Sequence, residues 1–452
     1  MPLPEFIEIV PLQKPVQAEI AVPGSKSITN RALVLAALSE GVTTLRGALW
    51  SEDTQVMVEG LRALGFEVHV AEDPLEACNR TITVQGLGGK IPPAGTLDAP
   101  LEIFVGNAGT AGRFLTALVC LGQGIYRLHG VKRMHERPQE ALFAALRELG
   151  YCIDSINDKL PATIHGAGRK PGATCCVSIA ESSQFASAVL LCARAGGWHI
   201  HVVGDNPEES PYLAMTTQLV EEFPKRGGEF QIEPDASSGS YFWGADWLLT
   251  KGKATVHSSI RVRDWPHSGW QIDQHFAQYL PPPNRVSRKN QLGDGIMTLI
   301  VLAACNEPEP SSDGDPHAPV ASAPAGTLAS ELKPLRFQET ERVEALQKEL
   351  GKLVLEPERH IFQEGDCLRI LPCRFHGQAA QIETYNDHRM AMCFATLGLK
   401  VPGIRIKNPA CVKKTFPNFF QKLAAPPPHG VGATILDAGT GRRLPVDELF
   451  AD

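Results

Sequence analysis

The chain has 452 residues, which exceeds what one hydrophobic core normally holds, so we expect two or three domains. Its 43 lysines and arginines stand against 50 aspartates and glutamates, giving a formal net charge of −7. This balance argues against bulk binding of nucleic acid or of an anionic membrane surface, because both require a basic face.

Composition also bears on where the protein works. No basic segment precedes an apolar stretch at the start, and no run of about 18 apolar residues occurs. The cysteines are scattered without a C-x-x-C pair, and the adjacent Cys175 and Cys176 are the closest couple. We therefore expect a cytoplasmic protein with reduced thiols, no metal site and no disulfide framework.

One pattern recurs six times along the chain: a short polar or glycine-rich cluster followed by a helix rich in alanine and leucine. Each cluster predicts the start of a helix. The clusters begin at Gly24, Gly106, Glu181, Asp235, Gly293 and Tyr385. Divided three and three, they indicate an α/β protein of two similar halves that meet near Asp235, with three α/β units in each half.

Second, amphipathic helices are best defined in three segments, each of which breaks at a glycine before a β-prone run. The segments are 53–70, 137–153 and 339–355, and the glycines are Gly65, Gly150 and Gly351. Residues 306–328 are rich in proline, serine, aspartate and alanine, which predicts a solvated insertion within the second half.

The first cluster, "PGSKSITNR", places Lys26 and Arg31 in the opening turns of a predicted helix. A cation there opposes the helix macrodipole at a cost of roughly 0.3–1 kcal/mol, so we expect a bound anion to offset it. Ser25, Ser27 and the free backbone amides would converge on the same anion. The glycine spacing is not that of a Walker A loop, which argues against hydrolysis of nucleoside triphosphates.

Three further motifs of the first half place charged or polar side chains next to a predicted helix. "GNAGTAGR" ends with Arg113 before a predicted helix, and "KRMHERPQ" places Arg137 just before another. The sequence does not decide whether Arg137 is a solvated surface charge or binds an anion. "ESSQF" contains Ser182, Ser183 and Gln184, which either cap a helix or hydrogen-bond a polyhydroxy substrate.

The second half adds two candidate carboxylates and further cations. They are Asp294, Glu339, Arg342, Arg389 and Lys414. His388 has no second ligand at a spacing typical of a metal site, and no G-x-S-x-G motif indicates a serine hydrolase. A local excess of cations in an acidic chain favours a cleft for a small polyanion.

Eight segments follow one another over nearly the whole chain: "PGSKSITNRALVLAAL", "GNAGTAGR", "ERP", "SSQF", "DASSGSYF", "ETER", "YNDHRMAMCF" and "KKTFPNFF". In this order they resemble the EPSP synthase (3-phosphoshikimate 1-carboxyvinyltransferase) family. The resemblance implies an α/β fold of two similar domains, each of three βαβαββ units, that close over a central cleft. Residues 1–24 with 235–452, including the insertion at about 306–328, would form the first domain and 25–234 the second.

The same resemblance implies transfer of the enolpyruvyl group of phosphoenolpyruvate to the 5-hydroxyl of 3-phosphoshikimate, with release of phosphate and without a metal or cofactor. We expect a monomer with these two small-molecule substrates and with neither nucleic acid nor a membrane as partner.

Individual site residues follow from the matching motifs. Those that would bind 3-phosphoshikimate are Lys26, Ser27, Arg31, Ser182, Ser183, Gln184, Tyr212, Asp294 and Gln338. Those that would bind phosphoenolpyruvate are Lys26, Gly109, Arg137, Gln184, Arg342, Arg389 and Lys414. Asp294 would accept the hydroxyl proton and Glu339 would act near the methylene carbon, with Lys26 as the third catalytic residue.

The chain departs from the family pattern just before Glu339. The family has Asn-x-Arg-x-Lys-Glu there, whereas this chain has "PLRFQE", so Pro334 replaces the asparagine and Gln338 the lysine. Gln338 keeps a hydrogen-bond donor but carries no charge. Two interpretations follow: an active subfamily that relies on Asp294 as base, or a catalytically weakened homologue that binds phosphorylated metabolites.

Two further expectations rest on the resemblance. Gly109 predicts sensitivity to the inhibitor glyphosate, although Phe114 on the following helix is a departure that could shift it in either direction. The sister enolpyruvyl transferase acting on UDP-N-acetylglucosamine is disfavoured, because it opens with a different Lys-Asn motif and uses a loop cysteine.

Overall fold

The structure is a computed structural model that describes residues 2–204, 210–250, 259–306 and 326–451. The chain divides into two compact units. Unit 1 contains Met1–Val22, Ala236–Pro266 and Ile272–Asp452, and unit 2 contains Pro23–Asp235 and His267–Gln271. The sequence did not predict that the short segment 267–271 groups with unit 2.

The described part of unit 2 holds two four-stranded sheets and one two-stranded sheet. The first has the order β12-β3-β5-β4, formed by Gly228–Gln231, Glu40–Leu49, Asn79–Leu87 and Val68–Glu72. The second has the order β6-β7-β9-β8, formed by Leu101–Phe104, Gln123–His129, Ala162–Ala167 and Cys152–Asp154. The third pairs β10 (Thr174–Ser178) with β11 (His199–Val203).

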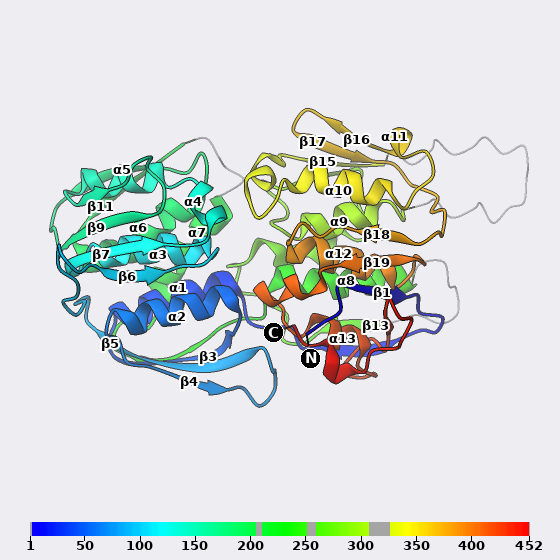
Figure 1. The fold of residues 1–452 in the computed structure, drawn as a ribbon, viewed down its shortest axis with the longest axis horizontal. Coiled ribbons are helices and arrows are strands. Elements are labelled where there is room, and N and C mark those ends of the chain that lie inside the picture. The colour runs from blue at the N-terminus through cyan, green and yellow to red at the C-terminus, as the bar shows by residue number, and fades with distance from the viewer. Residues whose placement is uncertain (1, 205–209, 251–258, 307–325, 452) are drawn as a thin grey trace, which may run out of the picture. The chain divides into compact units, whose positions relative to one another are not determined.

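Seven helices accompany these strands in the described part of unit 2. They are α1 (Lys26–Leu38), α2 (Glu52–Ala63), α3 (Gly109–Val119), α4 (Lys132–Glu136), α5 (Glu140–Glu148), α6 (Ser183–Gly196) and α7 (Ser210–Glu222). Figure 1 shows α1 and α2 lying over the sheet that contains β3, β4 and β5.

The described part of unit 1 repeats the plan. One sheet has the order β18-β19-β1-β20 (Ala380–Ile382, Ile404–Lys407, Phe6–Val10, Thr434–Asp437) and another β14-β15-β17-β16 (Arg285–Ser287, Thr327–Ser330, Cys367–Ile370, Ile361–Glu364). The third pairs β13 (Ser259–Val262) with β2 (Gln17–Ile20). The α-helices are α8 (Ala236–Thr250), α9 (Ile296–Ala303), α10 (Arg342–Gly351), α11 (Pro357–His360), α12 (His388–Gly398) and α13 (Phe419–Ala424). Short 3-10 segments are η2 (Ile272–Tyr279), η3 (Lys333–Phe337), η4 (Pro409–Lys414) and η5 (Val446–Leu449).

All four of these larger sheets have one pattern: a parallel strand pair followed by two antiparallel strands. Parallel neighbours require a crossover, usually a helix. Helices α3, α6, α9 and α12 each connect the two strands of one parallel pair. The expected α/β fold with repeated βαβαββ units is therefore confirmed.

Apart from the short segment His267–Gln271, which groups with unit 2 inside a stretch of unit 1, the chain passes between the units at two places. Helix α1 follows β2 in the sequence, yet β2 belongs to unit 1 and α1 to unit 2. Helix α8 follows β12, and here the crossing runs from unit 2 back to unit 1. The strand that precedes each of these crossings pairs within its own unit. In unit 1, β2 pairs in parallel with β13, and in unit 2, β12 pairs in parallel with β3.

The six predicted helix openings are confirmed, since α1, α3, α6, α8, α9 and α12 begin at or just after the six clusters. Gly65 and Gly150 have φ angles of +86° and +88°, and strands β4 and β8 follow them as expected. The strand expected directly after Gly351 is wrong. A left-handed Glu356 and Pro357 at the first position of α11 begin a short helix there, and β16 starts at Ile361.

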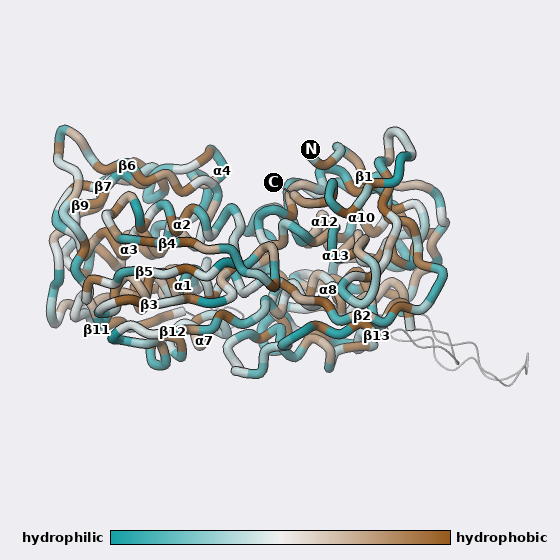
Figure 2. The backbone as a smooth tube through the Cα atoms, turned by 90° about the horizontal axis from the view of Figure 1, so that it is seen from below, coloured by the Kyte–Doolittle hydropathy of each residue, from teal (hydrophilic) through white to brown (hydrophobic). Residues whose placement is uncertain are grey.

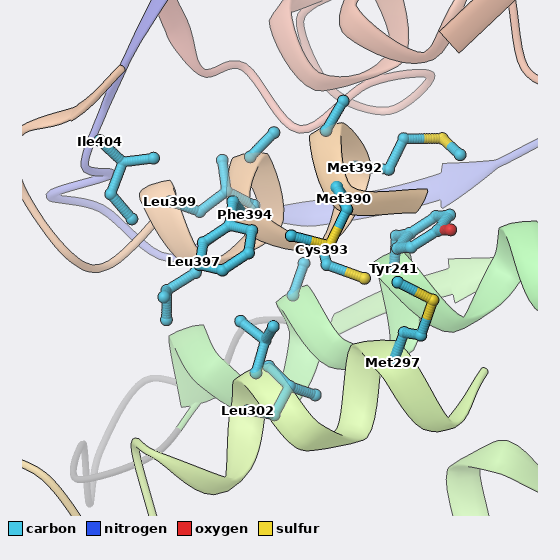
Figure 3. Close-up of a cluster of buried hydrophobic side chains, with 14 of the residues drawn as sticks. Tyr241, Met297, Leu302, Met390, Met392, Cys393, Phe394, Leu397, Leu399 and Ile404 are labelled. Atoms are coloured by element: carbon cyan, nitrogen blue, oxygen red, sulfur yellow. The ribbon is translucent and has the colours of Figure 1, made fainter. Parts of the chain in front are cut away.

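Each unit has its own hydrophobic core. In unit 1, Met390, Phe394 and Leu397 of α12 face Met297 and Leu302 of α9 (Figure 3). Figure 2 shows brown, hydrophobic stretches along the helices and strands of both units. Each fully buried Val, Leu, Ile, Phe or Met side chain contributes ~1.5–3 kcal/mol, so these cores hold the helices, and with them the helix openings, in place.

The C-terminal tail, which the sequence left without a role, supplies β20 to the sheet of unit 1 and buries Leu444 and Leu449 in the core. Of the predicted insertion 306–328, residues 307–325 lie outside the described residues. The predicted insertion extends too far at its C-terminal end, since Thr327 and Leu328 belong to β15. Among the described residues no helix is long and apolar enough to cross a membrane.

Candidate functional site

The N-terminal ends of α1, α3 and α6, which pack against one another, carry most of the unit 2 residues singled out by the sequence. Lys26 opens α1, and its Nζ lies 3.0 Å from Oδ2 of Asp53, a nearly buried carboxylate in the first turn of α2. Ser27 follows in a partly buried position. The N-terminus of α2 stabilises the negative charge of Asp53. Because Asp53 contacts Lys26, the positive charge of Lys26 is balanced within the protein.

Arg31 lies inside unit 2 and is only 2% exposed. Its Nε donates to Oγ1 of Thr216 at 2.8 Å, while its Nη atoms donate to the Ser27 carbonyl at 2.9 Å and to Oγ of Ser187 at 3.1 Å. Burial lowers the pKa of Arg31 to about 10, against a smaller opposing effect of Tyr212. The guanidinium ties α1 to α6 and α7, and the Tyr212 carbonyl accepts a further N–H at 3.4 Å.

Gly109 and Arg137 are in direct contact. A Cβ on Gly109 would lie 2.7 Å from the guanidinium carbon of Arg137, so only glycine leaves that guanidinium where it is. Nη1 of Arg137 donates to the Asn107 carbonyl at 3.1 Å. The Nε of Arg137 and the Oδ1 of Asn107 are buried and have no hydrogen-bond partner among the described residues. Buried polar atoms normally find partners, so this pair indicates a place for a polar ligand.

Ser182 is the N-cap of α6, with its hydroxyl accepting the backbone N–H of Gln184 at 3.2 Å, so the capping interpretation is confirmed. Ser183 is buried. The Gln184 side-chain oxygen accepts from Nη1 of Arg113 at 2.5 Å, and Nη2 of Arg113 donates to the Pro138 carbonyl at 3.0 Å. Arg113 therefore joins the start of α6 to the backbone next to Arg137.

In unit 1, Asp294 lies among three arginines just before α9. Its carboxylate oxygens are 2.9 Å from Nε of Arg389, 3.4 Å from Nη2 of Arg288 and 3.8 Å from Nη1 of Arg342. Burial alone would raise the pKa of Asp294, but the charges of Arg389, Arg342 and Arg288 hold it well below its ordinary value. Asp273 of η2 fixes the loop, because its carboxylate accepts the backbone N–H of Gly293 at 2.7 Å.

Arg342 is the centre of a second set of contacts. Its Nε and Nη2 reach the carboxylate of Asp387 at 2.7 and 3.2 Å, and Nη2 lies 2.8 Å from Oε2 of Glu339. The side-chain oxygen of Gln338 accepts from Nη1. Burial would lower the pKa of Arg342, yet the surrounding carboxylates raise it above its ordinary value. Lys414 completes the set, with Nζ 3.1 Å from Oε1 of Glu339.

The structure thus groups the predicted residues in two places. Unit 2 holds Lys26, Ser27, Arg31, Gly109, Arg137, Ser182, Ser183, Gln184 and Tyr212, and unit 1 holds Asp294, Gln338, Glu339, Arg342, Arg389 and Lys414. Pro334 lies in η3, which directly precedes Gln338 and Glu339 of the unit 1 group.

Five residues that position the predicted ones were not assigned such roles from the sequence. They are Asp53, Arg113, Asp273, Arg288 and Asp387. Arg113 and Asp387 lie inside quoted motifs, so proximity to the motif was an available signal. Asp53, Asp273 and Arg288 lie outside those motifs, and only the tertiary contacts reveal them.

Comparison with known proteins gives the family. Residues 10–226 and 287–423 match the model of EPSP synthase (3-phosphoshikimate 1-carboxyvinyltransferase). The chain belongs to the EPSP synthase family. A 3-phosphoshikimate 1-carboxyvinyltransferase of Laribacter hongkongensis is 34% identical over 459 residues, covering 93% of this chain and 99% of the relative. One of Rhizobium etli is 34% identical over 440 residues, with 92% and 96% covered.

Solved structures show the same fold. The EPSP synthase of Acinetobacter baumannii aligns over 95% of this chain and 99% of its own, with a TM-score of 0.64 at 19% identity. The enolpyruvyl transferase NikO of Streptomyces tendae aligns over 98% of this chain and 100% of its own, with a TM-score of 0.64 at 14% identity. The EPSP synthase family and the related transferase therefore share this chain's architecture.

Proposed function

We propose that this chain transfers the enolpyruvyl group of phosphoenolpyruvate to the 5-hydroxyl of 3-phosphoshikimate and releases phosphate. Membership of the EPSP synthase family and relatives of that name support the reaction. The observation that carries the proposal is the cluster in unit 1, where two carboxylates suited to proton transfer, Asp294 and Glu339, contact cations suited to a substrate carboxylate, Arg342, Arg389 and Lys414.

Unit 2 would bind the phosphate groups. Arg137 and Asn107 offer buried polar atoms without partners among the described residues, beside the backbone of Gly109. The hydroxyls of Ser182 and Ser183 and the N-terminus of α6 suit a second anion. On binding, an anionic group of the substrate would replace Asp53 as the ion-pair partner of Lys26. Arg31, already bonded on every side inside the unit, would act by fixing Ser27 and Tyr212.

Substrate binding would activate Asp294. The carboxylate of phosphoenolpyruvate needs Arg342 and Arg389, which now hold the pKa of Asp294 low. When the substrate carboxylate takes up their charge, the pKa of Asp294 rises and its carboxylate becomes a stronger base. Substrate binding would thereby convert Asp294 from an ion-pair partner of the arginines into a proton acceptor.

The chemical step balances with these groups. The 5-hydroxyl oxygen attacks the central carbon of the enol while its proton passes to Asp294, and the methylene carbon takes a proton from the side chain near it, for which Glu339 is proposed. The resulting tetrahedral intermediate then loses phosphate, which takes up the proton held by Asp294, while a methyl proton returns to Glu339 and the double bond is restored. The cations stabilise the charges and hold the reactants in line.

Phosphate release is the direct test. We expect the purified protein to release phosphate from phosphoenolpyruvate in the presence of 3-phosphoshikimate and not of UDP-N-acetylglucosamine. Asp294→Asn and Glu339→Gln should each lower kcat at least about 100-fold, the usual scale for a general acid or base. Binding of both substrates without release would refute the proposal and support a homologue that only binds phosphorylated metabolites.

Gln338 is tested separately. It bonds Arg342 through its side-chain oxygen, so it keeps a place in the cluster without a charge. We expect the protein with its native Gln338 to release phosphate from phosphoenolpyruvate. Activity found only in Gln338→Lys would contradict this. Glyphosate sensitivity, the monomeric state and the cytoplasmic location stay predictions, to be checked by an inhibition curve, by sedimentation and by fractionation.

A further inference from the structure

Three potential metal ligands lie on the outer face of a sheet in unit 2, away from the helix openings described above. β8 is an edge strand paired antiparallel with β9, and Cys152 lies directly opposite His165 in the register. Ile153 and Ile164 between them point into the core. Because side chains alternate across a strand, Cys152, Asp154 and His165 share the opposite, solvent-facing side.

The ligand atoms are close enough to hold one ion. Nε2 of His165 is 2.8 Å from Oδ2 of Asp154, Sγ of Cys152 is 3.9 Å from Oδ1 of Asp154, and the three ligand atoms lie within 4.8 Å of one another. Tetrahedral zinc with bonds of about 2.0–2.3 Å places its ligand atoms roughly 3.3–3.6 Å apart. Small side-chain rotations at these surface positions would bring the three atoms to that spacing.

We propose that Cys152, Asp154 and His165 bind one Zn²⁺ ion on the surface of unit 2, with water completing its coordination. A thiolate, an imidazole and a carboxylate together suit zinc, whereas magnesium and calcium prefer oxygen ligands alone. The ion takes the place of the hydrogen bond between His165 and Asp154, and Cys152 binds it as a thiolate. Binding therefore releases protons and strengthens as the pH rises.

An ordinary surface ion pair explains this cluster less well. Asp154 and His165 have side-chain exposures of 67% and 29%, and pairs exposed to this degree contribute little to stability. Cysteine is among the most frequently buried residues, yet Cys152 is exposed. The ligands come from two strands, so the linear spacing of cysteine and histidine in the sequence does not reveal the site.

Cobalt(II) is the probe for the first experiment, because a thiolate ligand gives it a near-ultraviolet charge-transfer band that an oxygen or nitrogen site lacks. We expect untagged full-length protein to show this band, saturating at one equivalent, and to lose it when Zn²⁺ is added. Cys152→Ser should abolish the band, and His165→Asn should weaken cobalt binding at least about tenfold.

Cys176→Ser is the matched control, since Cys176 is also exposed but lies on β10, outside the cluster. The band should survive in this variant. Unchanged phosphate release and thermal midpoints would show that each variant is folded, and they separate this proposal from the enzymatic one. Absence of the band with excess cobalt, or its persistence in Cys152→Ser, would overturn the proposal.

Discussion

Asp387 offers the sharpest test of how the unit 1 cluster is built. It is fully buried, contacts Arg342 through both carboxylate oxygens, and caps α12 by accepting the Arg389 backbone N–H at 2.9 Å. Asparagine retains the cap through its side-chain oxygen, whereas its NH2 group replaces the acceptor of the Arg342 Nε–H, so Asp387→Asn removes the charge and one hydrogen bond of the ion pair. Breaking a buried ion pair costs about 3–5 kcal/mol. Glu339 and Asp294 remain at 2.8 and 3.8 Å from Arg342, which places the expected loss at the low end, about 3 kcal/mol.

Urea unfolding followed by circular dichroism and by fluorescence measures that loss, the two probes being compared because two units can unfold separately. Asp387→Ala should cost about 1 kcal/mol more, since it also removes the cap. Glu356→Gln, which breaks an exposed pair with Arg359, is the control and should leave the midpoint unchanged. A loss below about 1 kcal/mol in Asp387→Asn would mean that Arg342 does not depend on this carboxylate.

Three further predictions concern other parts of the chain. Gly109→Ala should displace the Arg137 guanidinium and raise KM for phosphoenolpyruvate about tenfold or more with little change in unfolding midpoint, and an unchanged KM would argue against a ligand there. Because the pKa of Asp294 is depressed, its stabilisation is present above its unfolded value of about 3.9 and is lost only as pH falls through the lower folded value. The destabilisation by Asp294→Asn should therefore be constant from pH 8 to pH 5 in urea titrations, and a decline over that range would contradict the ion network. Burial raises the pKa of Cys175 to about 12, so a thiol reagent at pH 8 should modify Cys176 and spare its neighbour, as mass spectrometry of peptides would show.

Local patterns predicted most of the helical framework. A polar cluster before an alanine- and leucine-rich run carries its information within about fifteen residues, so the starts of all six helices followed from the sequence. The glycine breaks succeeded at Gly65 and Gly150, where a left-handed residue ends the helix. At Gly351 the helix α10 also ends as predicted, but the strand does not follow directly, because Pro357 starts another short helix before β16.

Long-range pairings could not be predicted in this way. The pairing of β1 with β20 joins the two ends of the chain, and no local signal in either strand names its neighbour. The carboxylates of Asp53 and Asp273 are ordinary acids in the sequence, and only the folded chain shows which residues they hold. Motifs therefore located the reactive side chains, whereas their support came from the tertiary structure.

Charge balance connects the first sequence observation with the proposed binding of substrate anions. The cations at helix openings were expected to need an anion, and the folded protein already supplies one to several of them: Asp53 to Lys26, Asp294 to Arg389. A substrate anion must displace these carboxylates, which reduces its net gain. Arg137 is different, because no carboxylate pairs with it among the described residues and its Nε lacks a partner there. A phosphate group that binds Arg137 therefore displaces no carboxylate of the described residues, and its net gain there is not reduced in this way.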